Sequence, residues 1–507
     1  MPDLGEAFGQ LGNGFAGALT VENLTAALLG CLLGTIIGIL PGIGPSTTVA
    51  LLIPIAFSIR PDSALIMMTG VYLGAMYGGS LTSVLLKVPG EVSSVMTALD
   101  GFEMAKQGRA GPALAVAAIG SFIGGTISVV GLTVFAPIIA RYALAFGPAE
   151  YFALMVAALL FTSVLLGADL LKGLIAVVIG LVIAVIGTDL QTGVPRLTFG
   201  FTAVLEGVDI IVLLMGIFGV GEVLWYLTHR TQEHGERLAL RGRLWLSRDD
   251  WGRSWPAIIR SSFVGFFAGV LPGSGSSLGG LLGYTVEQRV SKEPRRFGKG
   301  AIEGVAAPET ANNAATGGAL IPMLTLGIPG SGTTAVLLVV FTIYGIQPGP
   351  RLMTDNAELV WAVIASLYLS NVILLMMNLP LIPLFVRILD IPVRFLMPVI
   401  LTIAAVGAYS INNNPADVVL LFAFGVGGYL LRSVGIPLVP LVLAAILAPQ
   451  MERSLRQGIL LTHGDWLEML SRPIALAFLV AGIAIVAWDI WSKARQQRAP
   501  VPIAEDE

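Results

Sequence analysis

Charge is scarce in this sequence. Of its 507 residues, 29 are Lys or Arg and 32 are Asp or Glu, so charged residues make up 12% of the chain. Soluble domains carry about 25% charged residues, and disordered chains combine high charge with low hydrophobicity. Because 55% of this chain is hydrophobic, both classes are excluded and we expect an integral membrane protein. A net charge of -3 also provides no basic field for nucleic acid.

Cysteine and histidine are nearly absent as well. The single cysteine, Cys31, cannot form an intramolecular disulfide or a thiolate metal site. The three histidines, His229, His234 and His463, lie outside the apolar runs and form no HExxH pair, which argues against a zinc hydrolase. The first 23 residues contain no Lys or Arg, so the positive start of a cleavable signal peptide is missing.

Glycine, by contrast, occurs 61 times and equals all charged residues together. The charge-free segment 24–59 contains two prolines and two glycines in its middle, at 41–45. As one helix it would be about 54 Å long, whereas the hydrocarbon core of a membrane is about 30 Å thick. Proline and glycine break the helical hydrogen-bond ladder, so we expect a helical hairpin, either re-entrant or spanning. Segment 257–286 is broken in the same way at 271–275 and predicts a second hairpin.

The distribution of basic residues orients the two hairpins. Lys and Arg cluster on both sides of the second hairpin, at 230–260 and 289–299, so the positive-inside rule places both of its ends in the cytoplasm. The first hairpin is preceded by acidic residues without any Lys or Arg, and only Arg60 follows it closely. We therefore expect both ends of the first hairpin to lie in the periplasm.

The remaining apolar runs define two halves. Five crossings follow the first hairpin, at 63–99 (interrupted), 112–140, 150–168, 170–187 and 208–228. The series after the second hairpin is 304–341 (interrupted), 357–386, 394–411, 416–431 and 435–449, with a closing helix at 472–491. We predict an all-α polytopic membrane protein with repeat 1 at 1–228, a cytoplasmic basic linker at 229–256, repeat 2 at 257–450, and a C-terminal helix and cytoplasmic tail at 451–507. Arg453 and Arg456 would then lie outside, which argues against two crossings within 416–449.

Glycine and proline positions repeat between the halves. Three glycines spaced by four residues, Gly34 to Gly42, recur 231 residues later as Gly265 to Gly273, and each series leads into a Leu-Pro-Gly-x-Gly break. A second Pro-Gly break follows in each half, at 88–90 and 328–330, and hydroxyl side chains follow all four breaks. An odd number of crossings between equivalent hairpins makes the repeats inverted. Paired inverted repeats with interrupted helices are typical of secondary transporters.

Broken helices offer binding groups at membrane depth. Their free backbone N–H and C=O groups are tolerated only next to protein or a wet cavity. Half-helix N-termini attract anions, and unwound carbonyls and hydroxyls can hold a small cation. We expect substrate at the four breaks, at Gly42, Gly44, Ser46, Thr47, Ser93, Ser94, Gly273, Ser274, Gly275, Ser276, Ser277, Gly330, Ser331, Gly332, Thr333 and Thr334. For the glycine ladder Gly30, Gly34 and Gly38 alone, close helix packing is the favoured interpretation.

One carboxylate and two amides stand in the apolar stretch 304–350. Glu309 is its only charge, and Asn312 and Asn313 follow one turn later. Such groups are costly at membrane depth unless they have partners, so they indicate function, although Glu309 could instead cap a helix at the interface. The first half carries Leu73 and Gly74 at the positions equivalent to the two amides. The ion site is therefore predicted to be asymmetric.

Four segments, 38–45, 99–108, 308–314 and 326–331, resemble those of the TctA family, the large membrane subunit of the tripartite tricarboxylate transporters. The resemblance covers about residues 20–450. It implies a multi-pass permease of the bacterial inner membrane that works with a small four-helix membrane subunit and a periplasmic solute-binding protein. It also implies import of carboxylates such as citrate with an ion gradient, for which sodium is expected. No nucleotide site or covalent cofactor is expected, because the Gly-Ser-Gly-Thr-Thr run lacks the P-loop lysine.

These features give a hypothesis for transport. The hairpin tips meet near the membrane midplane, and the groups after each break receive substrate carboxylates. Sodium binds at Asn312, Asn313, Thr310 and the carbonyls of Pro41 and Pro329, and offsets the substrate charge because no arginine lies in these segments. An elevator-like rigid-body movement follows by analogy only. A channel with re-entrant loops is the alternative. An intramembrane enzyme would need catalytic residues such as His or Asp in the broken segments, and none is present there. The sequence does not exclude a scaffold subunit without transport activity.

Overall fold

The computed structural model describes residues 4–40, 44–166, 169–189, 191–229, 238, 245–273, 275–389 and 396–498. Within these residues the chain is almost entirely helical, and nine helices are long and apolar enough to cross a membrane. The predicted all-α polytopic membrane fold is confirmed. The helices pack as two units: unit 1 contains Met1–Ala145 and Ile186–Val434, and unit 2 contains Phe146–Val185 and Gly435–Glu507.

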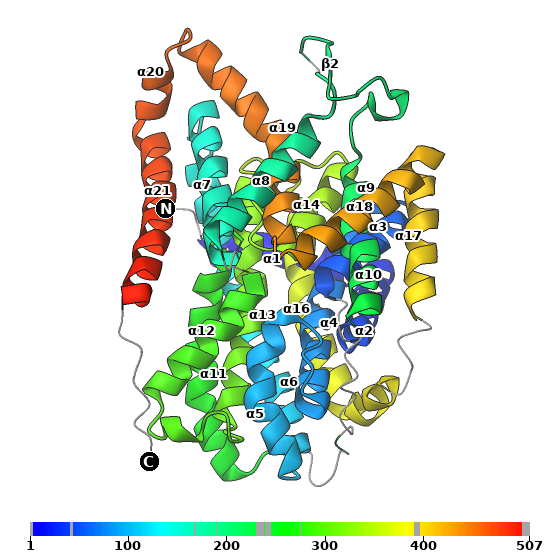
Figure 1. Ribbon diagram of the computed structural model, residues 1–507. Coiled ribbons are helices and arrows are strands. Elements are labelled where there is room, and N and C mark those ends of the chain that lie inside the picture. The colour runs from blue at the N-terminus through cyan, green and yellow to red at the C-terminus, as the bar shows by residue number, and fades with distance from the viewer. Residues whose placement is uncertain are drawn as a thin grey trace. The chain divides into compact units, whose positions relative to one another are not determined.

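Unit 1 contains both predicted hairpins (Figure 1). Its first part comprises α1 (Leu4–Ala18), α2 (Val21–Gly38), α3 (Pro45–Ala56), α4 (Pro61–Leu86), the 3-10 turn η1 (Val92–Ser94), α5 (Val95–Lys106) and α6 (Ala110–Ala143). A small antiparallel pair of strands and a short turn follow, β1 (Gly187–Thr188), β2 (Pro195–Arg196) and η2 (Thr202–Val204). They lead to α9 (Ile210–Leu214), the π-helical η3 (Met215–Val220) and α10 (Gly221–Thr228).

The second part of unit 1 begins at α11 (Arg248–Val270). It continues with α12 (Gly275–Val290), η4 (Pro294–Arg296), α13 (Glu303–Leu326), α14 (Gly332–Ile343), α15 (Leu352–Asp355), α16 (Ala357–Ile388), α17 (Leu396–Asn412) and α18 (Pro415–Ser433). The predicted hairpins are thus α2–α3 and α11–α12, and the predicted interrupted crossings are α4–α5 and α13–α14. Pro41, Gly42 and Ser274, three of the predicted binding residues, lie outside the described residues.

Unit 2 is built from two separate stretches of the chain. It comprises α7 (Pro148–Leu166), α8 (Leu170–Val185), α19 (Leu438–Leu461), α20 (Trp466–Ser471) and α21 (Pro473–Arg498). Helix α8 packs against α19 through Gly180, where a Cβ atom would collide with the Leu441 carbonyl, and α7 packs against both α19 and α21. The apolar region 416–449 therefore holds two separate helices, α18 and the first half of α19.

The Pro-Gly breaks follow from local backbone chemistry. Pro45 occupies the first turn of α3, where its missing N–H costs nothing. Helix α13 ends at Gly327, which has a φ of 70°, a conformation that favours glycine. The equivalent end of α4 is Lys87, whose φ is 59°. Each half therefore terminates its second long helix with a left-handed residue before the break.

Glycines let the helices of each half approach closely. A Cβ atom at Gly34 or Gly38 of α2 would collide with the backbone of α4, and one at Gly265 or Gly269 of α11 would collide with the backbone of α13. Contact between backbones at this distance is possible only without a side chain. The packing interpretation of the glycine ladder is confirmed, and it applies equally to the second half.

Each half contributes a long helix that packs against the other half. Helix α6, from the first half, packs along α13 of the second half, while α16, from the second half, packs along α4 of the first. In the same way α9, η3 and α10 pack against α17 and α18. The core of unit 1 is therefore shared by both halves, and its most deeply buried helices are α4 and α13.

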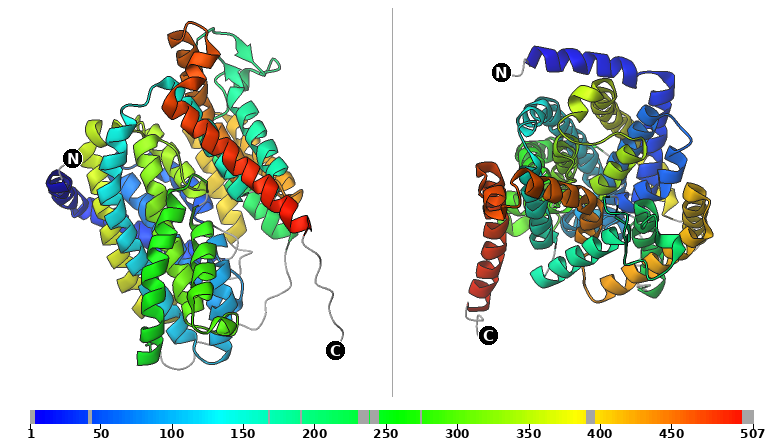
Figure 2. Two further views of the ribbon diagram at one scale, coloured as in Figure 1. Left: turned by 90° about the vertical axis from the view of Figure 1, so that its left-hand side faces the viewer. Right: turned by 90° about the horizontal axis from the view of Figure 1, so that it is seen from above.

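Helix α1 has no counterpart in the predicted spans. It runs across the long axes of the other helices of unit 1 (Figure 2) and packs against α16, where Gly14 lies on the backbone of Trp361. Its 15 residues include five glycines and an acidic first turn, so its composition does not resemble a spanning helix. Its contact with α16 stabilises a segment of low intrinsic helix propensity.

Candidate functional site

The two breaks of each half lie against each other. A Cβ atom at Gly90, in the second break, would meet the carbonyl of Gly38, which precedes the first break. In the second half, a Cβ atom at Gly330 would lie 3.0 Å from the carbonyl oxygen of Gly269. Gly90 and Gly330, which occupy equivalent positions in the two halves, therefore each pack on the carbonyl of the equivalent glycine, Gly38 or Gly269. Each half thus brings its two breaks together.

Contacts between the halves join all four breaks. The hydroxyls of Ser46, at the start of α3, and Thr333, at the start of α14, are 3.0 Å apart. The hydroxyl of Tyr72 lies 3.4 Å from that of Ser331. On the other side, a Cβ atom at Gly280 of α12 would lie 2.5 Å from the carbonyl oxygen of Ser93. The breaks therefore form a closed ring in which hydroxyl side chains of both halves face one another.

Backbone contacts complete this ring within the second half. The N–H of Gly275 donates to the carbonyl of Gly330 over 3.1 Å, and Gly273 and Gly275 have φ values of 78° and 54°. Ser331 and Thr334 form a reciprocal capping box at the N-terminus of α14. Within the described residues, the N-terminus of α3, at Gly44, has no side-chain cap, and the positive end of a helix favours an anion.

Other predicted substrate residues have individual local roles. Thr47 donates to the carbonyl of Phe218 over 3.0 Å, and Ser94 donates to the carbonyl of Glu91 over 2.9 Å. Both hydroxyls therefore bind backbone and do not point at the Ser46–Thr333 contact. Ser276 is buried and Ser277 half-buried in the first turn of α12, and Gly332 begins α14.

A second polar cluster lies on α13, where the sequence analysis places Glu309, Asn312 and Asn313. All three side chains are 0% exposed. The Thr97 hydroxyl donates to Glu309 Oε1 over 2.6 Å, and Asn312 Nδ2 lies 3.4 Å from Glu309 Oε2. Asn313 Nδ2 donates to Asn312 Oδ1 over 2.7 Å and to the hydroxyl of Ser121, on α6, over 2.8 Å. The cluster thus joins α5, α6 and α13.

The remaining predicted cation ligands differ in their surroundings. Thr310 is buried against Gly120 and Gly124 of α6, and its hydroxyl has no hydrogen-bond partner among the described residues. Pro329 is buried in the break between α13 and α14. The structure therefore brings Asn312 and Asn313 together and places Thr310 next to them on α13, whereas Pro41 lies outside the described residues.

Glu91 directly follows the Pro-Gly break at 88–90 and was not among the predicted site residues. Its carboxylate accepts from the backbone N–H of Ser93 over 2.8 Å and from the Ser93 hydroxyl. That hydroxyl lies 3.4 Å from Asn312 Nδ2, so Glu91 is connected to the α13 cluster. A charged residue next to a Pro-Gly break in an apolar segment was the signal that could have identified it.

No basic side chain of the described residues pairs with Glu91 or Glu309. Lys87, the nearest lysine in sequence, places its Nζ 5.8 Å from the ring centre of Phe102 instead. No group of three or more His, Cys, Asp or Glu side chains in the described part of the chain could hold a metal ion. The cluster instead offers two carboxylates with hydroxyl and amide oxygens, the hard ligands that suit small cations of the s-block.

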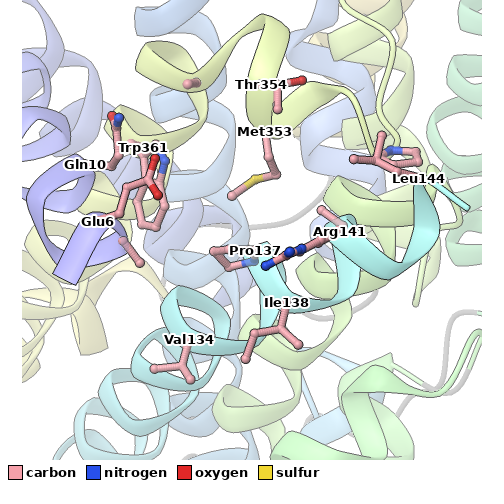
Figure 3. A pocket seen from close by; sticks show the side chains of 14 residues that line it. Glu6, Gln10, Val134, Pro137, Ile138, Arg141, Leu144, Met353, Thr354 and Trp361 are labelled. Carbon is pink, nitrogen blue, oxygen red and sulfur yellow. The ribbon is translucent and has the colours of Figure 1, made fainter. Parts of the chain in front are cut away.

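A cavity of about 250 Å³ lies in unit 1 apart from the breaks. It is lined mainly by apolar groups of α1, α6, α15 and α16, with Glu6 and Arg141 among its few polar residues (Figure 3). Of the residues of the four breaks that the structure describes, none lines it. The candidate functional site is therefore the ring of breaks with the adjoining cluster on α13.

Comparisons with known proteins agree with this architecture. The family model described as the tripartite tricarboxylate transporter TctA family matches residues 24–443. The chain is 43% identical over 494 residues, 97% of its length and 98% of the relative's, to the uncharacterized 52.8 kDa protein in the TAR-I ttuC' 3'region of Agrobacterium vitis. It is also 43% identical over 242 residues, 48% of its length and all of the relative's, to an uncharacterized protein in the TAR-II ttuC' 3'region of that organism. No solved structure matches. The chain therefore belongs to the tripartite tricarboxylate transporter TctA family, as a multi-pass membrane subunit of a transporter.

Proposed function

We propose that this protein imports organic carboxylates of the dicarboxylate or tricarboxylate type, driven by a cation gradient, with sodium as the coupling ion. Membership of the TctA family supports this function. The single observation that carries it is the contact between the two halves at Ser46 and Thr333, where the helix starts that follow one break of each half meet. In the tripartite assembly, a periplasmic solute-binding protein delivers the substrate and a small four-helix membrane subunit completes the permease.

The substrate carboxylates bind at the ring of breaks. The uncapped N-terminus of α3 supplies backbone N–H donors, and the hydroxyls of Ser46, Thr333 and Ser331 supply further donors from both halves. Donors on rigid helix ends bind an anion without a basic side chain. Sodium binds beside this site through Asn312 and neighbouring oxygens of α13, where the unpartnered buried hydroxyl of Thr310 fits a cation ligand. Inverted-repeat topology and an elevator-like movement of the hairpins would alternate access to the two sides.

Proteoliposome uptake tests this function. Protein reconstituted with the small subunit should accumulate a labelled member of a dicarboxylate and tricarboxylate panel when a binding protein and an inward sodium gradient are present. The uptake should saturate with substrate concentration. Non-saturating flux that ignores the sodium gradient would instead identify a channel, and absence of flux for the whole panel would refute the proposed substrate class.

Ser46→Ala and Thr333→Ala are each expected to lower uptake about tenfold, because a hydrogen bond to a charged group contributes about 1.5–3 kcal/mol. Ser276→Ala and Asn312→Ala should lower uptake by a similar factor or more. Thr25→Ala is the matched control, since the exposed Thr25 hydroxyl bonds only to its own helix at Val21. Wild-type uptake by both Ser46→Ala and Thr333→Ala, in protein with unchanged thermal stability, would contradict this site.

The proposal also fixes an orientation in the bacterial inner membrane. The basic linker 229–256, the loop after α12 and the C-terminus lie in the cytoplasm, and the loop around β1 and β2 lies in the periplasm. Cysteines placed at exposed loop positions test this, since the native Cys31 is buried. In right-side-out vesicles an impermeant maleimide should label Thr192→Cys, and should label Lys292→Cys only after permeabilisation. The reverse labelling pattern would invert the topology.

A further inference from the structure

Glu91 and Glu309 are connected by one continuous set of polar contacts. The Ser93 hydroxyl binds the Glu91 carboxylate and lies 3.4 Å from Asn312 Nδ2, which in turn lies 3.4 Å from Glu309 Oε2. The two carboxylates belong to different halves of the chain, one to the break after α4 and the other to α13. A single hydroxyl and a single amide therefore separate two acidic groups at the contact between the halves.

No basic side chain of the described residues compensates the charge of this pair, of which Glu309 is fully buried and Glu91 half-buried. Glu309 is 0% exposed and its partners are neutral donors, the hydroxyl of Thr97 and the amide of Asn312. A buried charge requires a counter-charge or neutralisation, and two neighbouring carboxylates raise that requirement. Neutral hydrogen bonds alone do not meet it.

Unpartnered oxygens lie next to the pair. Asn313 Oδ1 and the Tyr77 hydroxyl are buried and have no hydrogen-bond partner in the described part of the chain, and their residues are 0% and 3% exposed. Asn313 Nδ2 donates to Asn312 Oδ1 and to the main-chain carbonyl of Glu309, and Tyr77 lies on α4, which packs against α13. Buried polar atoms normally have partners, so these oxygens indicate a ligand that binds several oxygens at once. A small monovalent metal cation has that preference, and the donor set fits it.

Glu91 also adjoins the proposed substrate site. Tyr72 of α4, the helix that precedes the break before Glu91, places its hydroxyl 3.4 Å from that of Ser331 at the N-terminus of α14. Its neighbour Gly90 packs on Gly38 at the first break. An anionic substrate at the ring of breaks would therefore be repelled by Glu91 as long as that carboxylate carries an uncompensated charge.

We infer that Glu91 and Glu309 are the anionic ligands of the coupling sodium ion, and that filling this site is the condition for binding the anionic substrate. The inference rests on the proposed function and deepens it: the site is centred on two carboxylates, one from each half, and Asn312 and Asn313 contribute beside them. Because Glu91 follows a Pro-Gly break and Glu309 lies on the continuous helix α13, the site is complete only while the break is docked on α13. Sodium occupancy would thereby stabilise the docked arrangement.

Sodium binding without substrate provides the direct test. Purified wild-type protein should melt at a higher temperature when NaCl replaces choline chloride at constant ionic strength, because a ligand of the native state stabilises it by mass action. Glu91→Gln and Glu309→Gln keep the size of each side chain and remove its charge, and each should lose most of this sodium-dependent shift. Glu103→Gln is the matched control on α5, where Glu103 pairs with Lys106, and it should keep the full shift.

Two results would overturn the inference. One is a wild-type protein whose melting temperature ignores sodium, and the other is an unchanged sodium shift in both Glu91→Gln and Glu309→Gln. For Glu91→Gln, the ratio of carboxylate binding with sodium to binding without sodium should fall at least tenfold relative to wild type. In the uptake assay, this variant should no longer accumulate carboxylate against a gradient. Failure of the proposed function looks different, since the wild-type sodium shift would persist while no carboxylate of the panel is taken up.

Discussion

Gly34→Leu is expected to prevent the packing of α2 on α4, and little or no folded protein should be recovered. Any Cβ atom at this position collides with the Val71 backbone, which cannot rotate away as a side chain could. Overpacking of a core by side-chain contact already costs about 1–3 kcal/mol. Here whole helices must separate, and α4 carries Tyr72 and leads into Glu91, so both the fold and the site depend on this contact.

Gly12→Leu is the matched control for this prediction. Gly12 lies in a helix as Gly34 does, but a Cβ atom there would have no neighbour within 4 Å. Fluorescence-detected gel filtration of tagged variants measures the result directly. Gly12→Leu should give the monodisperse peak of wild type, and Gly34→Leu should give aggregate or no peak. A monodisperse Gly34→Leu protein with wild-type melting temperature would show that α2 and α4 can be separated at little cost.

The glycine ladder also shows how much of the fold can be predicted from sequence. Charge-free runs and Pro-Gly breaks predicted most of the long apolar helices, because the cost of placing charge and broken backbone in lipid leaves few alternatives. They did not predict α1, and α19 extends to Leu461, well beyond the predicted end at 449. The exchange of α6 and α16 between the halves could not be predicted. Both helices are apolar around most of their circumference, so their sequences do not specify which neighbour they contact.

Only part of the candidate site could be predicted from the sequence. Residues after the Pro-Gly breaks were identified because proline and glycine leave a visible pattern, and Ser46 and Thr333 do meet. The partners of Glu309 were not identified, because Thr97 and Ser121 are ordinary hydroxyl residues of apolar helices and only the fold brings them to α13. Contacts between residues about 200 positions apart carry no local signal in a single sequence.

Asp100 illustrates the same limit within a segment that carries the family resemblance. It is 0% exposed, and its Oδ1 accepts from the backbone N–H groups of Gly300 and Ala301 over 2.9 Å and 2.8 Å. Its Oδ2 accepts from the Tyr284 hydroxyl over 2.9 Å. One carboxylate on α5, from the first half, therefore holds α12 and the segment that begins α13, both from the second half.

Asp100→Ala is expected to lower the free energy of unfolding by about 3–5 kcal/mol, since each buried group left without a partner costs about 1–3 kcal/mol and three donors lose theirs. Tyr284→Phe removes only one of the three bonds and should cost about 1 kcal/mol. Glu103→Ala, one turn along α5, removes an exposed ion pair with Lys106 and should change stability by less than about 0.5 kcal/mol. Thermal unfolding of the purified variants, followed by intrinsic fluorescence, gives this order.

The order of the three losses in unfolding free energy shows whether the Asp100 hydrogen bonds stabilise the fold or can be replaced by water at no cost. If Asp100 holds the N-terminus of α13, then Asp100→Ala must cost more than Tyr284→Phe, because only the former leaves backbone N–H groups without an acceptor. Equal melting temperatures for Asp100→Ala and Glu103→Ala would mean that water replaces the carboxylate at no cost. The same tie positions Glu309 relative to α5, where Thr97 donates to it, so Asp100→Ala should also reduce the sodium-dependent stabilisation. Tyr284→Phe, which leaves both backbone bonds in place, should preserve it.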